Sequence, residues 1–133
     1  MRSIKFRGKR LYDGEWVYGC PLVVDTDKRK VAMIVTLHEA YPDTLAKVTT
    51  SVDFNSLGQF TGMLDKNGLE IYEGDIVRHD ENSEYFEVEY DAPEFRYKEN
   101  TFGFRFMVYT PELITVVGNI HDNPELINKR TND

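Results

Sequence analysis

The chain has 133 residues, 41% of them hydrophobic and 13% aromatic, and its formal net charge is −7. This apolar content excludes a disordered chain, and the aromatic content favours strands, whose pleated surface suits flat side chains. Cys20 is the single cysteine, so no internal disulfide can form. The longest apolar run, Val31–Val35, is far shorter than the ~20 residues that cross a bilayer. The basic first ten residues lack the apolar run of a secretory signal, so we expect a cytoplasmic protein with no membrane association.

Charge is distributed unevenly along the chain. Residues 1–10 carry five basic side chains and no acidic one, whereas residues 65–99 hold twelve acids against four bases. The structural explanation of the basic group is an edge strand whose charges deter edge-to-edge pairing. The functional explanation is a strip that binds phosphate or a partner. The surrounding negative charge argues against nucleic acid, because affinity for phosphates depends on positive charge.

The first part of the chain shows strand patterns joined by turns. Ile4–Arg7 and Glu15–Tyr18 flank Asp13-Gly14, a dipeptide typical of the type I′ turn, and they predict a hairpin. Leu22–Val24 and Val31–Thr36 are apolar runs on either side of a polar loop, and they predict a second hairpin.

A further strand and an internal boundary follow. Pro42 argues against a continuous helix over residues 38–46, which we interpret as a loop or one short turn. Lys47–Phe54 has the β-branched content of a strand, and Asn55–Gly58 has the residues of a loop. We expect an N-terminal β-hairpin region over residues 1–57, a second folded region over residues 58–127 and a polar tail over residues 128–133.

Two tight turns organise the start of the second region. Gly68, at the end of Asp65–Gly68, can adopt the left-handed conformation that closes a type I turn. Glu73–Asp75 is the second turn and leads into a strand over Ile76–His79. A calcium loop has glycine at its sixth position and an acid at its twelfth. This stretch has neither, because its glycine comes fourth and Ile76 comes twelfth, so we interpret it as a hairpin turn.

Two segments of alternating polarity predict strands with one buried face. In Glu84–Tyr90 and in Phe102–Tyr109, apolar side chains occupy every second position. If these two strands pair, Arg105 lies near Glu87 or Glu89.

The end of the chain predicts one more strand and a helix start. The strand covers Leu113–Ile120. Asn123, Pro124 and Glu125 are typical of an N-cap, a first helical position and the positive end of the helix dipole. Short, bent strands commonly avoid open edges by closing into a small barrel. We therefore predict a mainly β fold, with a small SH3-like barrel in the C-terminal half, an N-terminal β-hairpin-rich region and a short C-terminal helix.

The sequence has no residue pattern typical of catalysis or metal binding. His38, His79 and His121 are far apart and have no second ligand at a useful spacing. Cys20 lacks the setting of a reactive thiol, so we expect a buried or inert cysteine. Acid pairs on alternating strands are typical of solvated surface. We expect a protein that is not an enzyme and has no catalytic residue, metal or cofactor.

Several aromatic side chains are expected on outward faces or loops, namely Tyr85, Phe95, Tyr97 and Tyr109. They either cover the junction between the two halves or form a patch for a peptide, another subunit or stacked bases. The candidate binding residues are therefore Arg2, Lys5, Arg7, Lys9, Arg10, Tyr85 and Tyr97.

A set of motifs resembles the YopX family of phage and prophage proteins. It comprises QFTG at Gln59–Gly62, DKNG at Asp65–Gly68, EIYEGDIV at Glu70–Val77 and GNIHDNPEL at Gly118–Leu126, with IKFRG and DGEWVYG before them. The motifs occur in the family's order from Ile4 to Leu126, whereas Met63-Leu64 and the long loop Asp25–Lys30 look particular to this chain. The resemblance implies a C-terminal SH3-type barrel, a phage or prophage origin and action in the cytoplasm of a bacterial host. It implies no activity and no catalytic residues.

Three functions of different kinds follow from these patterns. The leading hypothesis is a non-enzymatic phage accessory module that binds a protein, either a host or phage protein or a second copy of itself. The alternative is a small nucleic-acid-binding barrel that uses the basic N-terminal strand and binds with a steep salt dependence. An enzyme that acts on nucleotides is the third, and it requires distant acids and histidines to converge in the fold.

Overall fold

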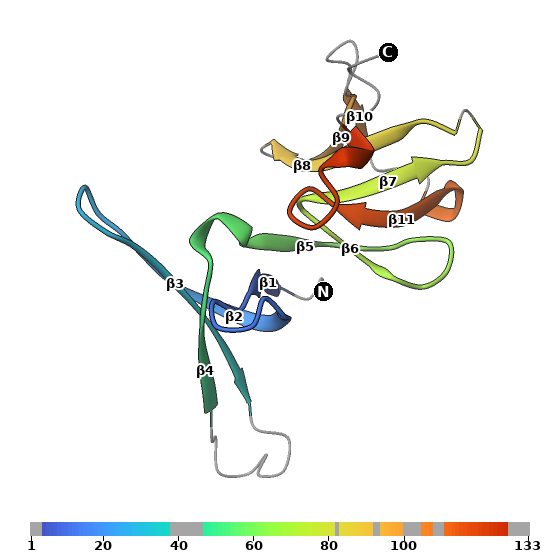
Figure 1. The fold of residues 1–133 in the computed structure, drawn as a ribbon. Helices are drawn as coiled ribbons and strands as arrows, with labels where there is room; N and C mark the ends of the chain where they lie inside the picture. The colour runs from blue at the N-terminus through green and yellow to red at the C-terminus, as the bar shows by residue number, and fades with distance from the viewer. Residues whose placement is uncertain are drawn as a thin grey trace. The chain divides into compact units, whose positions relative to one another are not determined.

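The computed structural model describes residues 4–37, 47–81, 83–91, 94–99, 105–107 and 111–127, so the loop expected over residues 38–46 lies outside this part. The chain divides into two compact units, residues 1–60 and residues 61–133. Both units are built from antiparallel strands (Figure 1). The prediction of a mainly β fold is therefore confirmed.

The first unit contains both predicted hairpins. Its strands are β1 (Phe6–Lys9), β2 (Trp16–Asp25), β3 (Lys30–Leu37), β4 (Lys47–Val52) and the start of β5 (Gly58–Leu64). They lie in the order β4-β3-β2-β1-β5. The sequence indicated two separate strands where β2 runs without interruption, and β4 ends earlier than expected because a 3-10 turn, η2 (Phe54–Ser56), follows it.

Strand β2 changes its partner at Gly19. Up to Gly19 it pairs with β1, and from Cys20, which lies opposite Val35, it pairs with β3. A Cβ atom on Gly19 would lie 2.3 Å from the carbonyl oxygen of Val35. Glycine is therefore the residue that lets the two hairpins share one strand.

The turn between β1 and β2 differs from the predicted type. A type I′ turn needs a positive φ at both central residues. Gly14 has φ +74°, but Asp13 is not among the described residues with a positive φ. The loop is instead closed by the Arg10 N–H, which donates to the Glu15 carbonyl at 2.8 Å. The hairpin is confirmed, and the type I′ assignment is wrong.

The hydrophobic core of the first unit lies on one side of its sheet. Ala32, Ile34 and Val52 are its fully buried members, each 2% exposed or less. The half-buried side chains that pack against them are Phe6, Val17, Phe54 and Leu57. Residues of β3 that alternate with Ala32 and Ile34 must therefore face the opposite side of the sheet.

The second unit has its own core. Its strands after β5 are β6 (Glu70–Tyr72), β7 (Asp75–His79), β8 (Tyr85–Asp91), β9 (Glu94–Glu99), β10 (Arg105–Met107) and β11 (Ile114–Asn119), with a 3-10 turn η3 (Pro111–Leu113). Its buried apolar side chains are Ile71, Val77, Phe86, Val88 and Ile114. Five strands lie in the order β10-β9-β8-β7-β11, with β10 and β11 at the edges. No sheet of the described residues is closed, so the SH3-like barrel stays a prediction.

Strand β9 was not predicted, and it changes one expected contact. Strand β8 pairs with β7 and β9, and β10 pairs with β9, where Arg105 lies opposite Lys98. The strand that contains Arg105 therefore does not pair with the strand that contains Glu87 and Glu89. The pairing on which the predicted contact of Arg105 depended is therefore wrong.

The described part of the chain ends with a short helical turn at residues 125–127. Asn123 precedes this turn as predicted, but its side-chain oxygen accepts a hydrogen bond from the Asn119 N–H at 3.2 Å and so supports the preceding turn. The polar tail lies outside the described residues. In the part of the chain that the structure describes, none of the helices has the length and apolar character to cross a membrane.

Candidate functional site

The basic residues predicted as a binding strip share one face of β1. Lys5, Arg7 and Lys9 occupy alternate positions, so their side chains lie on the side opposite Phe6 and the core. The guanidinium of Arg7 lies 4.5 Å from the centre of the Trp16 ring, and the Arg7 side chain is buried, with 7% exposure. The predicted strip is thus partly inaccessible at its centre. Arg2 lies outside the described residues.

The two lysines of this face also lie over aromatic rings. The Lys9 ammonium is 5.9 Å from the centre of the Trp16 ring, and the Lys5 ammonium is 5.2 Å from that of Phe60. Cation–π contacts of this kind hold long side chains against the sheet. The face is therefore an ordered array of cations and rings, which the sequence did not indicate.

Arg10 belongs to a different arrangement. Its guanidinium forms two hydrogen bonds with the Asp13 carboxylate, at 2.9 and 2.6 Å, and it lies over the Tyr12 ring. The hydrogen bond from Arg10, together with the Glu15 N–H, lowers the pKa of Asp13, and the same bond raises the pKa of Arg10. Arg10 therefore holds the β1–β2 loop, and a phosphate would have to displace Asp13 to reach it.

The predicted aromatic candidates belong to the second unit. Tyr85 lies at the start of β8 on the face opposite the buried Phe86 and Val88, as expected, and its side chain is half buried. Tyr97 lies on β9, and its side chain is outside the described residues, as is that of Phe95; Tyr109 is outside them altogether.

The turn motifs of the sequence serve to hold the second unit together. The carboxylate of Asp65 accepts hydrogen bonds from the N–H groups of Asn67 and Leu69, at 2.8 and 2.9 Å, and from that of Val116 at 2.9 Å. Gly68 has φ +85°, as predicted. The oxygens of Asp65 are thus occupied by the backbone, which agrees with a hairpin turn at this stretch.

Asp75 in the next turn has the same function. It is 1% exposed, and its carboxylate accepts a hydrogen bond from the Tyr72 N–H at 2.7 Å. Asn119 caps the turn after β11, where its side-chain oxygen accepts from the N–H groups of His121 and Asp122. Among the described residues, no group of three or more His, Cys, Asp or Glu side chains is placed to hold a metal ion.

One exposed surface was not anticipated. On β2, the side chains of Tyr18, Leu22 and Val24 are 45, 52 and 53% exposed. Leu22 lies opposite Met33 on β3, and Cys20 lies opposite Val35. We call these six residues, Tyr18, Cys20, Leu22, Val24, Met33 and Val35, the outer face, because they alternate with the residues that face the core.

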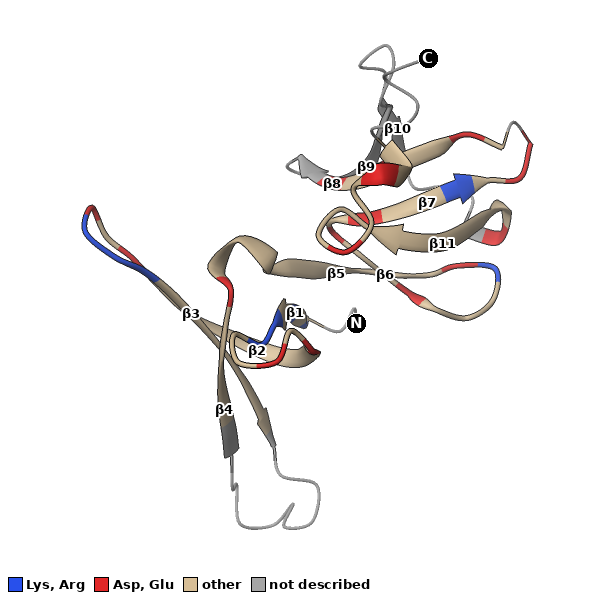
Figure 2. Ribbon diagram, in the orientation of Figure 1, with Lys and Arg blue, Asp and Glu red and all other residues tan. Residues whose placement is uncertain are grey.

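The six side chains of the outer face carry no charge, and the basic residues of β1 adjoin them, since Arg7 lies opposite Tyr18. Figure 2 shows that the charges of the β2–β3 hairpin gather at its tip, where Asp25, Asp27, Lys28, Arg29 and Lys30 lie. Cys20 is exposed, so of the two expected alternatives the buried cysteine is wrong and the inert one stays a prediction. A sheet with apolar residues on both faces is normally covered on both. The consecutive apolar residues Leu22–Val24 were the sequence signal for this surface, since a strand with one wet face would alternate.

Comparison with known proteins identifies the family. The family model described as YopX protein matches residues 5–128. This chain belongs to the YopX family. A solved structure, described as the crystal structure of protein EF1440 from Enterococcus faecalis, is 23% identical and has a TM-score of 0.57, covering 96% of this chain and 99% of that one. No curated protein matches the sequence.

These comparisons support the fold and leave the chemistry open. At 23% identity, the similarity to the Enterococcus faecalis protein shows a shared fold. In this YopX-family chain, the motifs that carry the resemblance include Asp65, Gly68, Asp75 and Asn119, all of which hold turns. The function must therefore be argued from the surfaces of this chain.

Proposed function

We propose that this protein is a non-enzymatic protein-interaction module and that the outer face of its first unit is the binding surface. The observation that carries the proposal is the exposure of Leu22 and Val24, at 52 and 53%, on an uncharged strip of sheet. Exposed apolar patches bounded by polar residues commonly mark protein-binding surfaces. The centre of such an interface is depleted in charged residues and enriched in aromatic residues and methionine. Tyr18 and Met33 fit this composition.

The partner is a host or phage protein or a second copy of this chain. The outer face has no charge to oppose either, although the whole chain carries −7. Because the chain is acidic, a charged contact between two copies would be repulsive, whereas an uncharged one would not. A host or phage protein and a second copy of this chain are therefore both compatible with binding at these six side chains.

Photo-crosslinking tests this proposal at single-residue resolution. Benzoylphenylalanine in place of Leu22 probes the outer face, and the same residue in place of Val23 is the matched control. Val23 is 48% exposed but lies on the other side of the strand. In the bacterium that carries the gene, we expect position 22 to give an adduct of discrete mass and Val24→Asp to abolish it. No adduct at position 22, or equal adducts at both positions, would contradict the proposal.

Nucleic-acid binding is the second candidate, and the cation–ring array on β1 favours it. Lys9 and Trp16 provide a positive charge beside a ring, which is the combination that single-stranded nucleic acids bind. The burial of Arg7 counts against it. A gel-shift series with single-stranded DNA and RNA at low salt is the test. Binding that is steep in salt and lost in Lys9→Glu would support this candidate, and no shift at micromolar protein would dispose of it.

The proposal also covers the origin of the protein, its location, the fold of its second unit and its lack of catalytic activity. Membership of the YopX family supports a phage or prophage origin and action in a bacterial cytoplasm. The number and shortness of the strands in the second unit support an SH3-like barrel. The role of the turn motifs in structure supports a protein that is not an enzyme. An experimental structure and a screen of nucleotide hydrolysis would test the last two points.

A further inference from the structure

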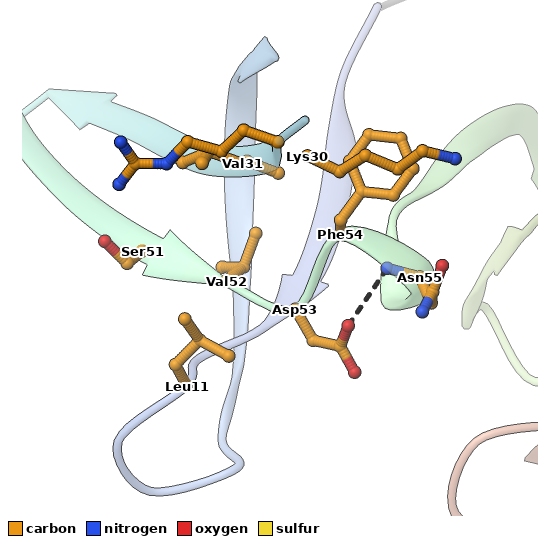
Figure 3. A pocket seen from close by; sticks show the side chains of 10 residues that line it. Leu11, Lys30, Val31, Ser51, Val52, Asp53, Phe54 and Asn55 are labelled. Atoms are coloured by element: carbon orange, nitrogen blue, oxygen red, sulfur yellow. Dashed lines mark hydrogen bonds between the residues drawn. The ribbon is translucent and has the colours of Figure 1, made fainter. Parts of the chain in front are cut away.

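The first unit has a pocket of about 460 Å³ at the point where β4 ends. Strand β4 pairs with β3 up to the pair Ala32 and Val52, and then leaves the sheet through Asp53 into η2. Strand β3 continues to Lys30, paired with β2 on its other side. Among the described strands, none neighbours residues 30–31 of β3 on the side of β4. The pocket occupies this notch, as Figure 3 shows.

The floor of the pocket is apolar and firmly packed. Ala32 and Val52 are 1 and 2% exposed and belong to the core of the unit. Phe54 lines the pocket beside Val52, whereas the side chain of Val31 faces the other side of β3, where it lies opposite Val24. Leu11, which is 66% exposed, also lines the pocket (Figure 3). A large apolar side chain entering the notch would thus meet a preformed surface and would cover Leu11.

Two cations line the same pocket. The ammonium of Lys30 lies 5.5 Å from the centre of the Phe54 ring, which holds it over the notch. Arg29 is placed by a turn in which its N–H donates to the Thr26 side-chain oxygen at 3.1 Å. In the described part of the chain, the guanidinium of Arg29 has no hydrogen-bond or ion-pair partner. Its donors are therefore available to a ligand.

Asp53, the acidic residue that lines the pocket, stabilises the turn that follows β4. The carboxylate of Asp53 accepts a hydrogen bond from the Asn55 N–H at 3.0 Å, the dashed line in Figure 3, and so caps η2. With Arg29 and Lys30 against Asp53, the pocket retains one excess positive charge. It therefore favours an acidic ligand over a basic one.

We propose that this pocket binds an extended peptide segment of a partner protein, in which a large apolar side chain is flanked by acidic ones. The apolar side chain occupies the floor at Val52, and the carboxylates contact Arg29 and Lys30. Residues 30–31 of β3 have no strand neighbour on the side of β4 among the described strands, so a short extended segment of a peptide can lie along them. A nucleobase fits less well, since Lys30 already covers a face of the Phe54 ring.

This site differs from the outer face but adjoins it, because Val31 of the pocket lies opposite Val24 and Ser51 lies opposite Met33. The two surfaces have no residue in common, and neither proposal requires the other. The ligand here is defined by charge and an extended backbone, whereas the outer face is uncharged.

Nuclear magnetic resonance titration of the full-length, ¹⁵N-labelled chain is the test. The probe is the peptide acetyl-Ser-Glu-Phe-Leu-Glu-Ser-amide. We expect shifts of the amide signals of Val31, Val52 and Asn55, and about a tenfold weaker affinity in Arg29→Glu, because a charge-assisted hydrogen bond is lost and a repulsion is added. Lys28→Glu is the matched control, because it makes a like change of charge in the same hairpin and Lys28 does not line the pocket. The spectra also report whether each variant is folded.

Two further ligands identify what the pocket recognises. A peptide with Lys in place of Glu, and one with Ser in place of Phe and Leu, should each bind at least tenfold more weakly. Absence of shifts at millimolar peptide, equal losses in Arg29→Glu and Lys28→Glu, or undiminished binding of either control peptide would overturn the proposal. Free 3-phenylpropionate binding as tightly as the peptide would also overturn it, in favour of a small-molecule site. Val24→Asp should abolish crosslinking at position 22, but the same variant should bind the peptide with unchanged affinity. The two proposals can therefore fail independently.

Discussion

The carboxylate of Asp65 accepts a hydrogen bond at 2.9 Å from the backbone N–H of Val116, a residue 51 positions further along the chain. The same carboxylate closes the turn between β5 and β6 through two other N–H groups. One buried side chain thus joins a local turn to the last strand of the unit. A long-range contact of this kind stabilises the fold because it ties together segments whose association costs chain entropy.

Replacement of Asp65 by alanine should lower the free energy of unfolding by about 2 kcal/mol, since three part-buried N–H groups lose their acceptor. Asp65 is 5% exposed, so water cannot replace the carboxylate without local opening. The control is Asp80→Ala, which removes two surface ion pairs, with Lys66 at 3.0 Å and with Arg78 at 4.0 Å, and should cost less than about 1 kcal/mol. Urea denaturation measures both variants. Equal losses would show that Asp65 does not hold the unit together.

Gly19→Ala should be one of the most destabilising single-methyl additions in the first unit. The new Cβ would lie 2.3 Å from the Val35 carbonyl oxygen, and a backbone atom cannot move aside cheaply, so we expect a cost above about 2 kcal/mol. The control is Gly68→Ala, where nothing lies within 4 Å of the added carbon and φ is +85°. That variant should lose about 1 kcal/mol from backbone strain alone. Thermal unfolding of both variants ranks them, and the reverse order would contradict the sheet geometry at Gly19.

Local signals in the sequence were sufficient for the turns and for most strands. The left-handed conformation of Gly68 is set by the residues of its own turn, so the local sequence predicted it. The alternation around Phe86 and Val88 predicted two buried side chains, which are 2 and 0% exposed in the structure. Strand β9 escaped detection because its charged residues and the preceding Pro93 are typical of a loop. Its place between β8 and β10 depends on which strands pair, and pairing is a property of the whole sheet.

The surfaces were harder to predict than the turns. The sequence predicts an exposed Arg7. Its side chain is buried because the register of β1 against β2 brings it over the Trp16 ring. Arginine next to a ring on a neighbouring strand loses exposure through stacking, which no pattern within one strand reveals. The pocket beside Val52 likewise depends on the residue at which β4 leaves the sheet. Only the apolar run Leu22–Val24 carried a sequence signal for a surface.

Loss of the partner of Asp13 should shift its titration. The folded-state pKa of Asp13 lies below its ordinary value because Arg10 and the Glu15 N–H hydrogen-bond to the carboxylate. The stabilisation by this pair is therefore present above the unfolded-state pKa, near 4, and is lost as the pH falls through the folded-state value. In Arg10→Gln, the pKa of Asp13 should rise towards 3.8. Carboxyl carbon shifts followed by nuclear magnetic resonance measure it, and an unchanged pKa would exclude Arg10 as the main cause.

The thiol of Cys20 reports directly on the outer face. Because Cys20 is exposed, maleimide should label it in the native, dilute protein at a rate close to that of a free thiol. If the outer face binds a partner or a second copy, labelling should slow as that partner or the protein itself is added, since Leu22 and Cys20 occupy the same face of β2. Val24→Asp should restore fast labelling at high concentration, and Val23→Asp should not. Labelling that is slow at every dilution, or that never responds to concentration or to a crosslinked partner, would contradict the assignment of this face.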